Sequence, residues 1–165
     1  MIVASSAGVL TSGPGAEGAS IVDNTIGLDA AGTTPLVMDG YGIRVDATPG
    51  VTVTGNRIGD AGNAAISVTG TDQIAELPDG DLAPNPSSGA DEGGTVTGGG
   101  VEIRENVVGL SNGGSAFVPG TSPIGIEAFG DASDVRIVGN TVAGQTEAGI
   151  DIFGGSGHRM HANRL

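Results

Sequence analysis

The chain has 165 residues with 19 Asp and Glu against six Lys and Arg, a formal net charge of −13. Such an acidic chain repels a phosphate backbone, and no apolar run approaches the length of a transmembrane helix, so neither nucleic-acid binding nor membrane insertion is expected. Aromatic residues are only 2% of the chain and Cys is absent, so burial must come from Val, Ile, Leu and Ala without disulfides.

Two landmarks alternate along the chain. The first is a small residue followed by a β-branched one, at Gly8-Val9, Gly42-Ile43, Ala65-Ile66, Gly125-Ile126 and Gly149-Ile150. The second is an Asn with apolar residues three positions before and two after it, at Asn24, Asn56, Asn106, Asn140 and Asn163. Apolar alternation around the landmarks predicts short half-buried strands, near residues 43–46, 51–54, 66–69, 101–104, 135–138 and 150–153. We interpret each Asn as a bend, because Asn tolerates a left-handed backbone.

The repeat is short and has one long interruption. One period, from Asn140 to Asn163, is 23 residues, too few to bury its own apolar face, so we expect the repeats to stack as a solenoid in a single domain over residues 1–165. Residues 71–98 are rich in Pro, Gly, Ser and acidic residues, which predicts an inserted surface loop. Within it, Asp79 and Asp81 resemble the start of a calcium-binding loop, and a solvated acidic loop without calcium is the other interpretation.

Two stretches carry a family resemblance. The phrases "NTIGLDAAGTTPLVMDGYGIRV" and "GNTVAGQTEAGIDIF" resemble repeats of the right-handed parallel β-helix proteins of the pectin-lyase-like superfamily. The resemblance implies an all-β fold, a right-handed parallel β-helix (β-solenoid) of about five coils with one long inserted loop and almost no α-helix. It also implies that the five Asn line up as a ladder, each side-chain amide bonding its neighbours above and below, with a structural role.

The same superfamily includes lyases, hydrolases, epimerases, adhesins and structural solenoids, so fold alone does not give the activity. Glu127 and Asp151 are outward carboxylates that suit the pair of a glycoside hydrolase, and Arg44 suits the base of a lyase if calcium is held nearby. The Asp cluster of the polygalacturonase-like hydrolases and the Asp-Pro-His motif of the alginate epimerases are absent, and the outward face is poor in the aromatics that usually stack on sugars. Ordinary ion pairs between coils, such as Glu102 with Arg136, explain the charges equally well. A polysaccharide-active enzyme is therefore the alternative, and a non-enzymatic function is favoured.

The leading hypothesis is structural. The chain finishes "HANRL" and begins "MIVASSAGVL", and neither stretch matches a recognisable cap. If one copy follows another, the step from Asn163 to the next Val9 is 11 residues, close to the 10 between Asn56 and Ile66. We therefore expect a solenoid that assembles head to tail into an extracellular filament, or a segment of a long surface or adhesive solenoid with a cell-surface glycan as a further partner. The residues expected at the assembling ends are Ile2, Val9, Met160, Asn163 and Leu165.

Overall fold

The computed structural model describes residues 6–70, 74–76, 82–84, 100–110 and 122–165. Within these residues the fold is all-β, and the helical content is limited to the 3-10 turn η1 (Pro14–Ala16). The frequent Gly and β-branched residues disfavour a longer helix. The expectation of an all-β fold with almost no helix is confirmed.

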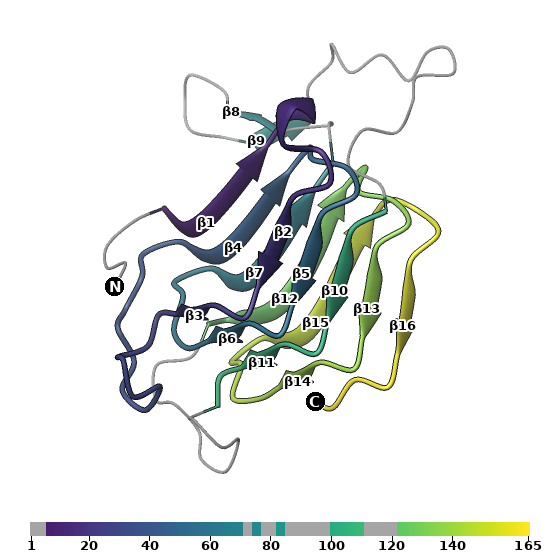
Figure 1. The fold of residues 1–165 in the computed structure, drawn as a ribbon. Coiled ribbons are helices and arrows are strands. Elements are labelled where there is room, and N and C mark those ends of the chain that lie inside the picture. Colours follow the sequence, from purple (N-terminus) through teal and green to yellow (C-terminus); the bar gives the residue numbers. More distant parts are fainter. Residues whose placement is uncertain (1–5, 71–73, 77–81, 85–99, 111–121) are drawn as a thin grey trace, which may run out of the picture.

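Three sheets of parallel strands form the structure (Figure 1). Sheet A has the order β1 (Ala7–Ser12), β4 (Tyr41–Asp46), β7 (Ala64–Thr69), β12 (Ile124–Gly130) and β15 (Ala148–Gly154). Sheet B has the order β2 (Ser20–Val22), β5 (Thr52–Thr54), β10 (Glu102–Arg104), β13 (Arg136–Val138) and β16 (Arg159–His161). Sheet C has the order β3 (Thr25–Ile26), β6 (Arg57–Ile58), β11 (Val107–Val108) and β14 (Thr141–Val142).

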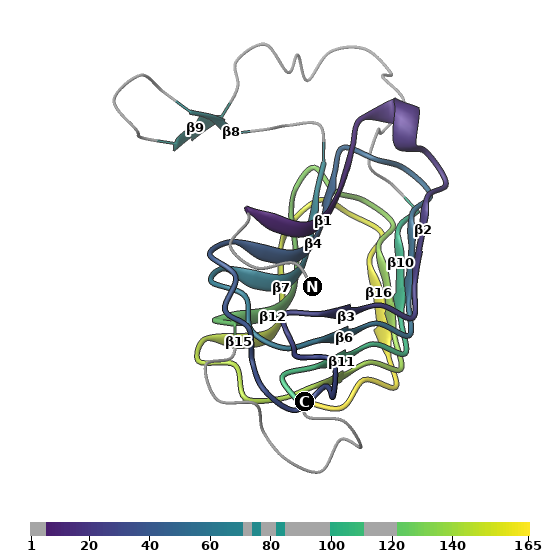
Figure 2. The same cartoon turned by 60° about the vertical axis from the view of Figure 1, so that its left-hand side comes forward.

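Each sheet takes one strand from every pass of the chain. We define the first coil as β1, β2 and β3, the second as β4, β5 and β6, and the third as β7, β10 and β11; the fourth is β12, β13 and β14, and the fifth is β15 and β16. Figure 2 shows sheets A and B as opposite walls with sheet C joining them at the bottom. This arrangement is compatible with a β-solenoid, in which each unit contacts only its neighbours.

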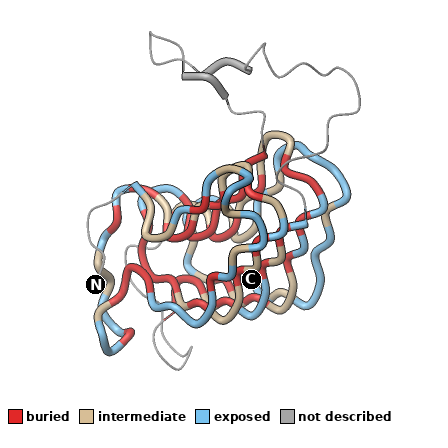
Figure 3. The backbone as a smooth tube through the Cα atoms, turned by 45° about the horizontal axis from the view of Figure 1, so that its top comes forward, coloured by how far each residue is buried: buried red, intermediate tan, exposed pale blue. Residues whose placement is uncertain are grey.

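The core runs through the middle of the coils as columns of in-register residues. One column in sheet B is formed by Ile21, Val53, Ile103, Ile137 and Met160. The middle three of these side chains are fully buried, whereas Met160 in the fifth coil is 52% exposed. Figure 3 shows the same change, with buried residues concentrated in the inner strands and exposed residues in the coil that carries the C-terminus.

The small residue of the first landmark is explained by the close packing of successive coils. A Cβ at Gly42 would lie 2.5 Å from the Ala65 carbonyl oxygen and 2.7 Å from the Ile58 Cγ2. Both distances are shorter than a carbon atom tolerates, so a larger residue would push neighbouring coils apart. The sequence pattern therefore marks a place where sheet A approaches the residues of sheet C.

All six predicted strands are present, with ends that agree within two residues. The six predicted strands did not include β1, β2 and β16 of the two outermost coils, nor the strands of sheet C, whose two residues are too few to show alternation. Within the predicted insertion at 71–98, β8 (Ile74–Glu76) and β9 (Leu82–Pro84) pair antiparallel. Asp79, Asp81 and Ile2 lie outside the described residues.

Candidate functional site

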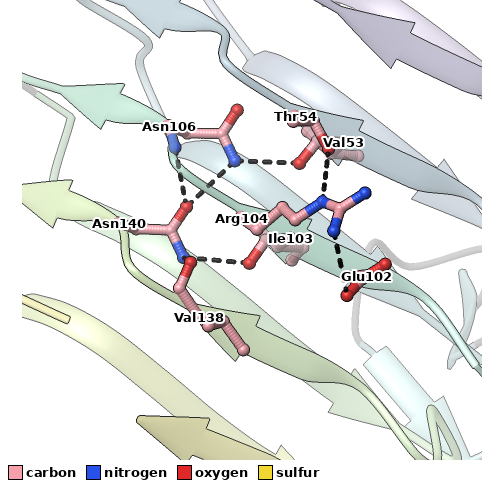
Figure 4. A network of polar contacts seen from close by, with 8 residues as sticks. All are labelled: Val53, Thr54, Glu102, Ile103, Arg104, Asn106, Val138 and Asn140. Atoms are coloured by element: carbon pink, nitrogen blue, oxygen red, sulfur yellow. Dashed lines mark hydrogen bonds and ion pairs between the residues drawn. The ribbon is translucent and has the colours of Figure 1, made fainter. Parts of the chain in front are cut away.

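The five landmark asparagines form a continuous hydrogen-bonded row where sheet B meets sheet C. From the second coil on, each Oδ1 accepts from the Asn of the preceding coil. The Asn56 backbone N–H donates to Asn106 Oδ1 at 2.9 Å and the Asn56 Nδ2 donates to it at 3.1 Å. Asn106 donates in the same two ways to Asn140 Oδ1, both at 3.0 Å. From the second coil on, each Nδ2 also donates to a carbonyl of the preceding coil, as Asn106 does to the Val53 carbonyl and Asn140 to the Ile103 carbonyl (Figure 4).

The same bonds join the ends of the row to its centre. Asn24 donates from its backbone N–H and Nδ2 to Asn56 Oδ1, and Asn140 donates likewise to Asn163 Oδ1, each at 3.0 Å. The three central asparagines are fully buried. Since a buried amide without partners costs about 1–3 kcal/mol, this row stabilises the stack, and its buried atoms are not available to a substrate.

The bend beside each Asn is made by the residue before it. The positive φ angles belong to Asp23, Gly55, Glu105, Gly139 and Ala162, with values between 54° and 66°. The expectation that Asn itself adopts the left-handed conformation is therefore wrong. The left-handed residue turns the chain from sheet B into sheet C, which leaves the Asn free to direct its N–H and amide along the stack. Three of the five positions are not Gly, so the ladder must offset a conformational cost there.

The catalytic candidates of the sequence lie on one face of sheet A. Leu10, Arg44, Ser67, Glu127 and Asp151 are successive in-register partners. They alternate along their strands with the buried core residues, so they belong to the outer face. Glu127 and Asp151 are direct neighbours on β12 and β15, whereas Arg44 is separated from Glu127 by the strand that carries Ser67.

Aromatic residues that the sequence analysis overlooked gather beside the two carboxylates. A hollow of about 260 Å³ is lined by Tyr41, Phe129 and Phe153 together with Glu127 and Asp151. Phe129 and Phe153 are in-register partners, and Phe153 is 78% exposed. The observation that the outward face is poor in aromatics is therefore wrong for this region. The repeat contained the signal, because each Phe comes three positions after the β-branched residue of its landmark.

The two carboxylates of this hollow differ in environment. Burial raises the pKa of Glu127 above its ordinary value, and the charge of Asp151 raises it further. The Ser67 hydroxyl and the Arg44 guanidinium beside it lower the pKa of Glu127, but burial is the larger effect. Asp151 is exposed. A carboxyl with a raised pKa next to a carboxyl that is exposed to water is the arrangement that acid–base catalysis uses.

The Arg44 guanidinium contacts an aromatic ring and a carboxylate of its own strand. Its guanidinium lies 5.2 Å from the centre of the Tyr41 ring and its Nη2 lies 3.7 Å from Asp46 Oδ2. A second hollow, of about 520 Å³, is lined in part by these three residues and by Leu10. Both contacts are ones that a guanidinium makes as a cation, with an aromatic ring and with a carboxylate.

The ion pairs differ from those expected between coils. Glu102 and Arg136 are in-register partners, but no ion pair joins them in the described structure. Glu102 instead lies 3.8 Å from Arg104 on its own strand, and Arg104 Nε donates to Thr54 Oγ1 at 3.3 Å (Figure 4). The side chains of Glu102 and Arg104 are 31% and 45% exposed, so this pair contributes little to stability.

The residues expected at the assembling ends occupy the two outermost coils. Val9 is half-buried in β1, Asn163 is half-buried after β16, and Met160 and Leu165 are exposed. Leu165 follows Arg164, whose bridge to Thr141 continues sheet C into the fifth coil. These residues therefore flank the stack at opposite ends.

The described residues contain no group of three His, Cys, Asp or Glu side chains that would hold a metal ion. None of their helices has the length and apolar character needed to cross a membrane. No protein-family model, curated protein or solved structure matches the chain.

Proposed function

We propose that the chain is a right-handed parallel β-helix of the pectin-lyase-like kind and that its function is structural. In this proposal the coils of one copy stack on those of the next, forming a filament outside the cell or on its surface. The three parallel sheets and the buried Asn row support the β-helix. Such a fold presents the same backbone hydrogen-bonding groups at each end of the stack, which suits repeated addition of coils.

The observation that carries the proposal is the position of the exposed apolar residues. All six large apolar side chains that are exposed among the described residues belong to the first or the fifth coil or their connections: Leu10, Val22, Val37, Phe153, Met160 and Leu165. The described residues of the second, third and fourth coils expose none. Of these side chains, Met160 and Leu165 continue columns that are buried in the interior coils, so the fifth coil presents an apolar surface that a further coil would cover.

Stacking must overcome charge repulsion. Covering Met160 and Leu165 stabilises a contact by about 1.5–3 kcal/mol for each side chain that becomes fully buried. Against this, a net charge of −13 on every copy opposes association at low ionic strength. Salt screens this repulsion and divalent cations reduce it further, so both should promote assembly.

A segment of a longer surface or adhesive solenoid is the other form of this function. In that case a further coil of the same polypeptide covers the fifth coil. The two forms differ in what the chain of 165 residues does alone, because only the filament requires contact between separate copies.

The test is to measure the assembly of the purified chain by light scattering and electron microscopy across protein and salt concentrations. We expect linear particles that grow with salt, and a Leu165→Asp variant that folds normally by circular dichroism but stays monomeric. A matched Thr52→Asp variant, on the outer face of the second coil, should still assemble. A chain that stays monomeric at high concentration and high salt would contradict the filament.

A polysaccharide-active enzyme is the second candidate, favoured by the hollow on sheet A. Neighbouring strands place Glu127 and Asp151 about 4.8 Å apart at Cα, which suits the closely spaced carboxyl pair of a retaining glycoside hydrolase. Glu127, with its raised pKa, would protonate the glycosidic oxygen while Asp151 attacks the anomeric carbon. The Phe153 ring offers a face for a sugar to stack on.

The enzyme candidate is tested by assaying hydrolysis and lyase cleavage of neutral and acidic polysaccharides, with and without calcium. Activity that is lost in both Glu127→Gln and Asp151→Asn, but kept in a Glu102→Gln control, would support it. Equal product formation by the wild type and the Glu127→Gln variant would eliminate this pair as the catalytic residues.

A further inference from the structure

The Asn ladder has a direction, and its two ends are chemically different. Among the described residues nothing accepts from the Asn163 backbone N–H, and Asn163 Nδ2 donates only to the Ile137 carbonyl, at 2.8 Å. At the other end, no described group donates to Asn24 Oδ1. Every interior asparagine uses all of these groups. The fifth coil therefore ends in unused donors, and the first coil begins with an unused acceptor.

The interior steps show what would satisfy both ends. At each interior step, an Asn donates from its backbone N–H and from its Nδ2 to the Oδ1 of the Asn in the next coil. The Nδ2 of the Asn in the next coil donates in return to a carbonyl of the preceding coil, that of the residue three positions before the preceding Asn. Adding one more step, we propose that a second copy places its first coil on the fifth coil of this one. Asn163 then donates twice to Asn24 of the second copy, whose Nδ2 donates to the Met160 carbonyl. This inference rests on the proposed assembly and specifies its polarity and register.

The ladder excludes the other two polarities. If two fifth coils met, the Asn163 donors of one copy would face the Asn163 donors of the other. If two first coils met, Asn24 oxygens would face each other. Both arrangements leave polar groups unpaired inside a contact, which is strongly unfavourable.

The ladder also fixes which strands pair. Continuing the registers of sheet B places Met160 next to Ile21 of the second copy, and continuing those of sheet A places Ile150 next to Val9. Apolar residues then meet at the positions where they meet between the interior coils. Leu165 comes to lie next to Ile26, in the column that contains Ile58 and Val142.

The outward neighbours produced by this register do not repel each other. Asp151 lies next to Leu10 of the second copy, and Arg159 lies next to Ser20. At these two positions, the contact places no acidic side chain of one copy directly beside an acidic side chain of the other. The repulsion that opposes assembly is then the long-range charge of whole copies, which salt screens effectively.

Disulfide trapping tests the register, because the chain has no Cys of its own. One preparation carries Ser20→Cys and another carries Arg159→Cys, both at exposed positions. The inferred register places these two Cα atoms about 4.8 Å apart, within the range of a disulfide. We expect oxidation of the mixed assembly to give a covalent dimer that contains one copy of each variant.

Two controls define the geometry. The intramolecular variant Ser20→Cys with Thr52→Cys occupies the same column inside one chain and should oxidise, which shows that these positions admit a disulfide. Mixing Ser20→Cys with His161→Cys shifts the register by two residues, to a Cα separation of about 8 Å, and should give little cross-linking.

The outcomes separate this inference from the proposed function. Assembly without a mixed dimer, or with a stronger cross-link from His161→Cys, would keep the filament but overturn the register. Cross-linking between two Ser20→Cys copies, or between two Arg159→Cys copies, would overturn the polarity. Absence of any assembly by light scattering would overturn both. A mixed dimer that depends on assembly supports both.

Discussion

The third and fifth coils carry the same sequence pattern but present it to different surroundings. Ile103 and Met160 occupy the same column of sheet B, three positions before their asparagines. Ile103 is fully buried between two coils, whereas Met160 has a coil on only one side and is 52% exposed. Leu165 is 77% exposed in the column where Val108 is fully buried. Between the third and the fifth coil, the difference in burial therefore comes from the presence or absence of a further coil, not from the sequence pattern of the coil itself.

The first coil differs from the fifth. Ile21, which occupies the same column as Met160, is only 6% exposed. The exposed apolar residues of the first coil, such as Leu10 and Val22, lie at outward positions of their strands instead. The two ends of the stack are thus not equivalent, because the interior apolar positions are covered in the first coil and open in the fifth.

Truncation of a core side chain should show the largest difference between these coils. Ile103→Ala leaves a cavity between packed coils and should lower the free energy of unfolding by about 2–5 kcal/mol. Met160→Ala, in the same column, should change it by less than about 1 kcal/mol under low-salt conditions in which the chain is monomeric. Chemical denaturation of both variants measures these changes.

The comparison also extends to assembly. In high salt, Met160→Ala should raise the protein concentration needed for assembly. Ile103→Ala should change that concentration only by reducing the fraction of chains that are folded. Equal destabilisation by the two variants in the monomer would mean that the fifth coil is covered by the chain itself.

Replacing an interior or an end asparagine should show a smaller difference in unfolding free energy between interior and end coils. Asn106→Ala removes a fully buried amide and leaves the Asn56 donors without their acceptor, while Asn140 Oδ1 keeps only the bond from the backbone N–H of residue 106. We expect a loss of about 1–3 kcal/mol in unfolding free energy. Asn24→Ala, at the exposed end of the ladder, should cost less, because water can satisfy the groups that it leaves. Thermal or urea unfolding compares the two, and an unchanged midpoint for Asn106→Ala would refute a stabilising ladder.

The repeat pattern predicted much of the fold because it depends on local features. Asn and the apolar residues around it recur at fixed spacings, and those spacings located sheets A and B and the columns of the core. Sheet C was missed because its strands have two residues each. The left-handed residue before each Asn was missed because its identity varies from Gly to Glu, so no residue type marks it.

The candidate site was predicted only in part. That Glu127 and Asp151 are neighbours follows from aligning two landmarks, and the in-register pairing of β12 and β15 bears this out. The hollow beside them depends on Tyr41, which is two coils away from Glu127 and precedes its own landmark. Its proximity arises from the stacking of coils and the direction of a side chain, neither of which a pattern of residue types specifies.

The last prediction concerns Glu127 and gives the smallest effect. Burial raises its pKa in the folded chain, whereas the unfolded chain has the ordinary value, so between these values the folded chain binds more protons. The free energy of unfolding must then fall as the pH rises from below the ordinary Glu pKa through the raised one. Glu127→Gln cannot titrate, so its stability relative to the wild type should increase over that window. The gain should be a fraction of the roughly 1.4 kcal/mol that one pKa unit represents, because the side chain is partly in water.

Asp151→Asn provides the matched control for this effect. The Asp151 charge contributes to the raised pKa of Glu127, so its removal should lower that pKa and narrow the pH window in which the folded chain binds the extra proton. Urea unfolding of the wild type, both single variants and the double variant between pH 4 and pH 7 measures this coupling. The test quantity is the difference in unfolding free energy between chains with Glu and with Gln at position 127. If Asp151→Asn leaves this difference unchanged at every pH, the two carboxyls do not interact. Burial alone would then set the proton affinity of Glu127, and the acid–base pair of the enzyme candidate would lose its physical basis.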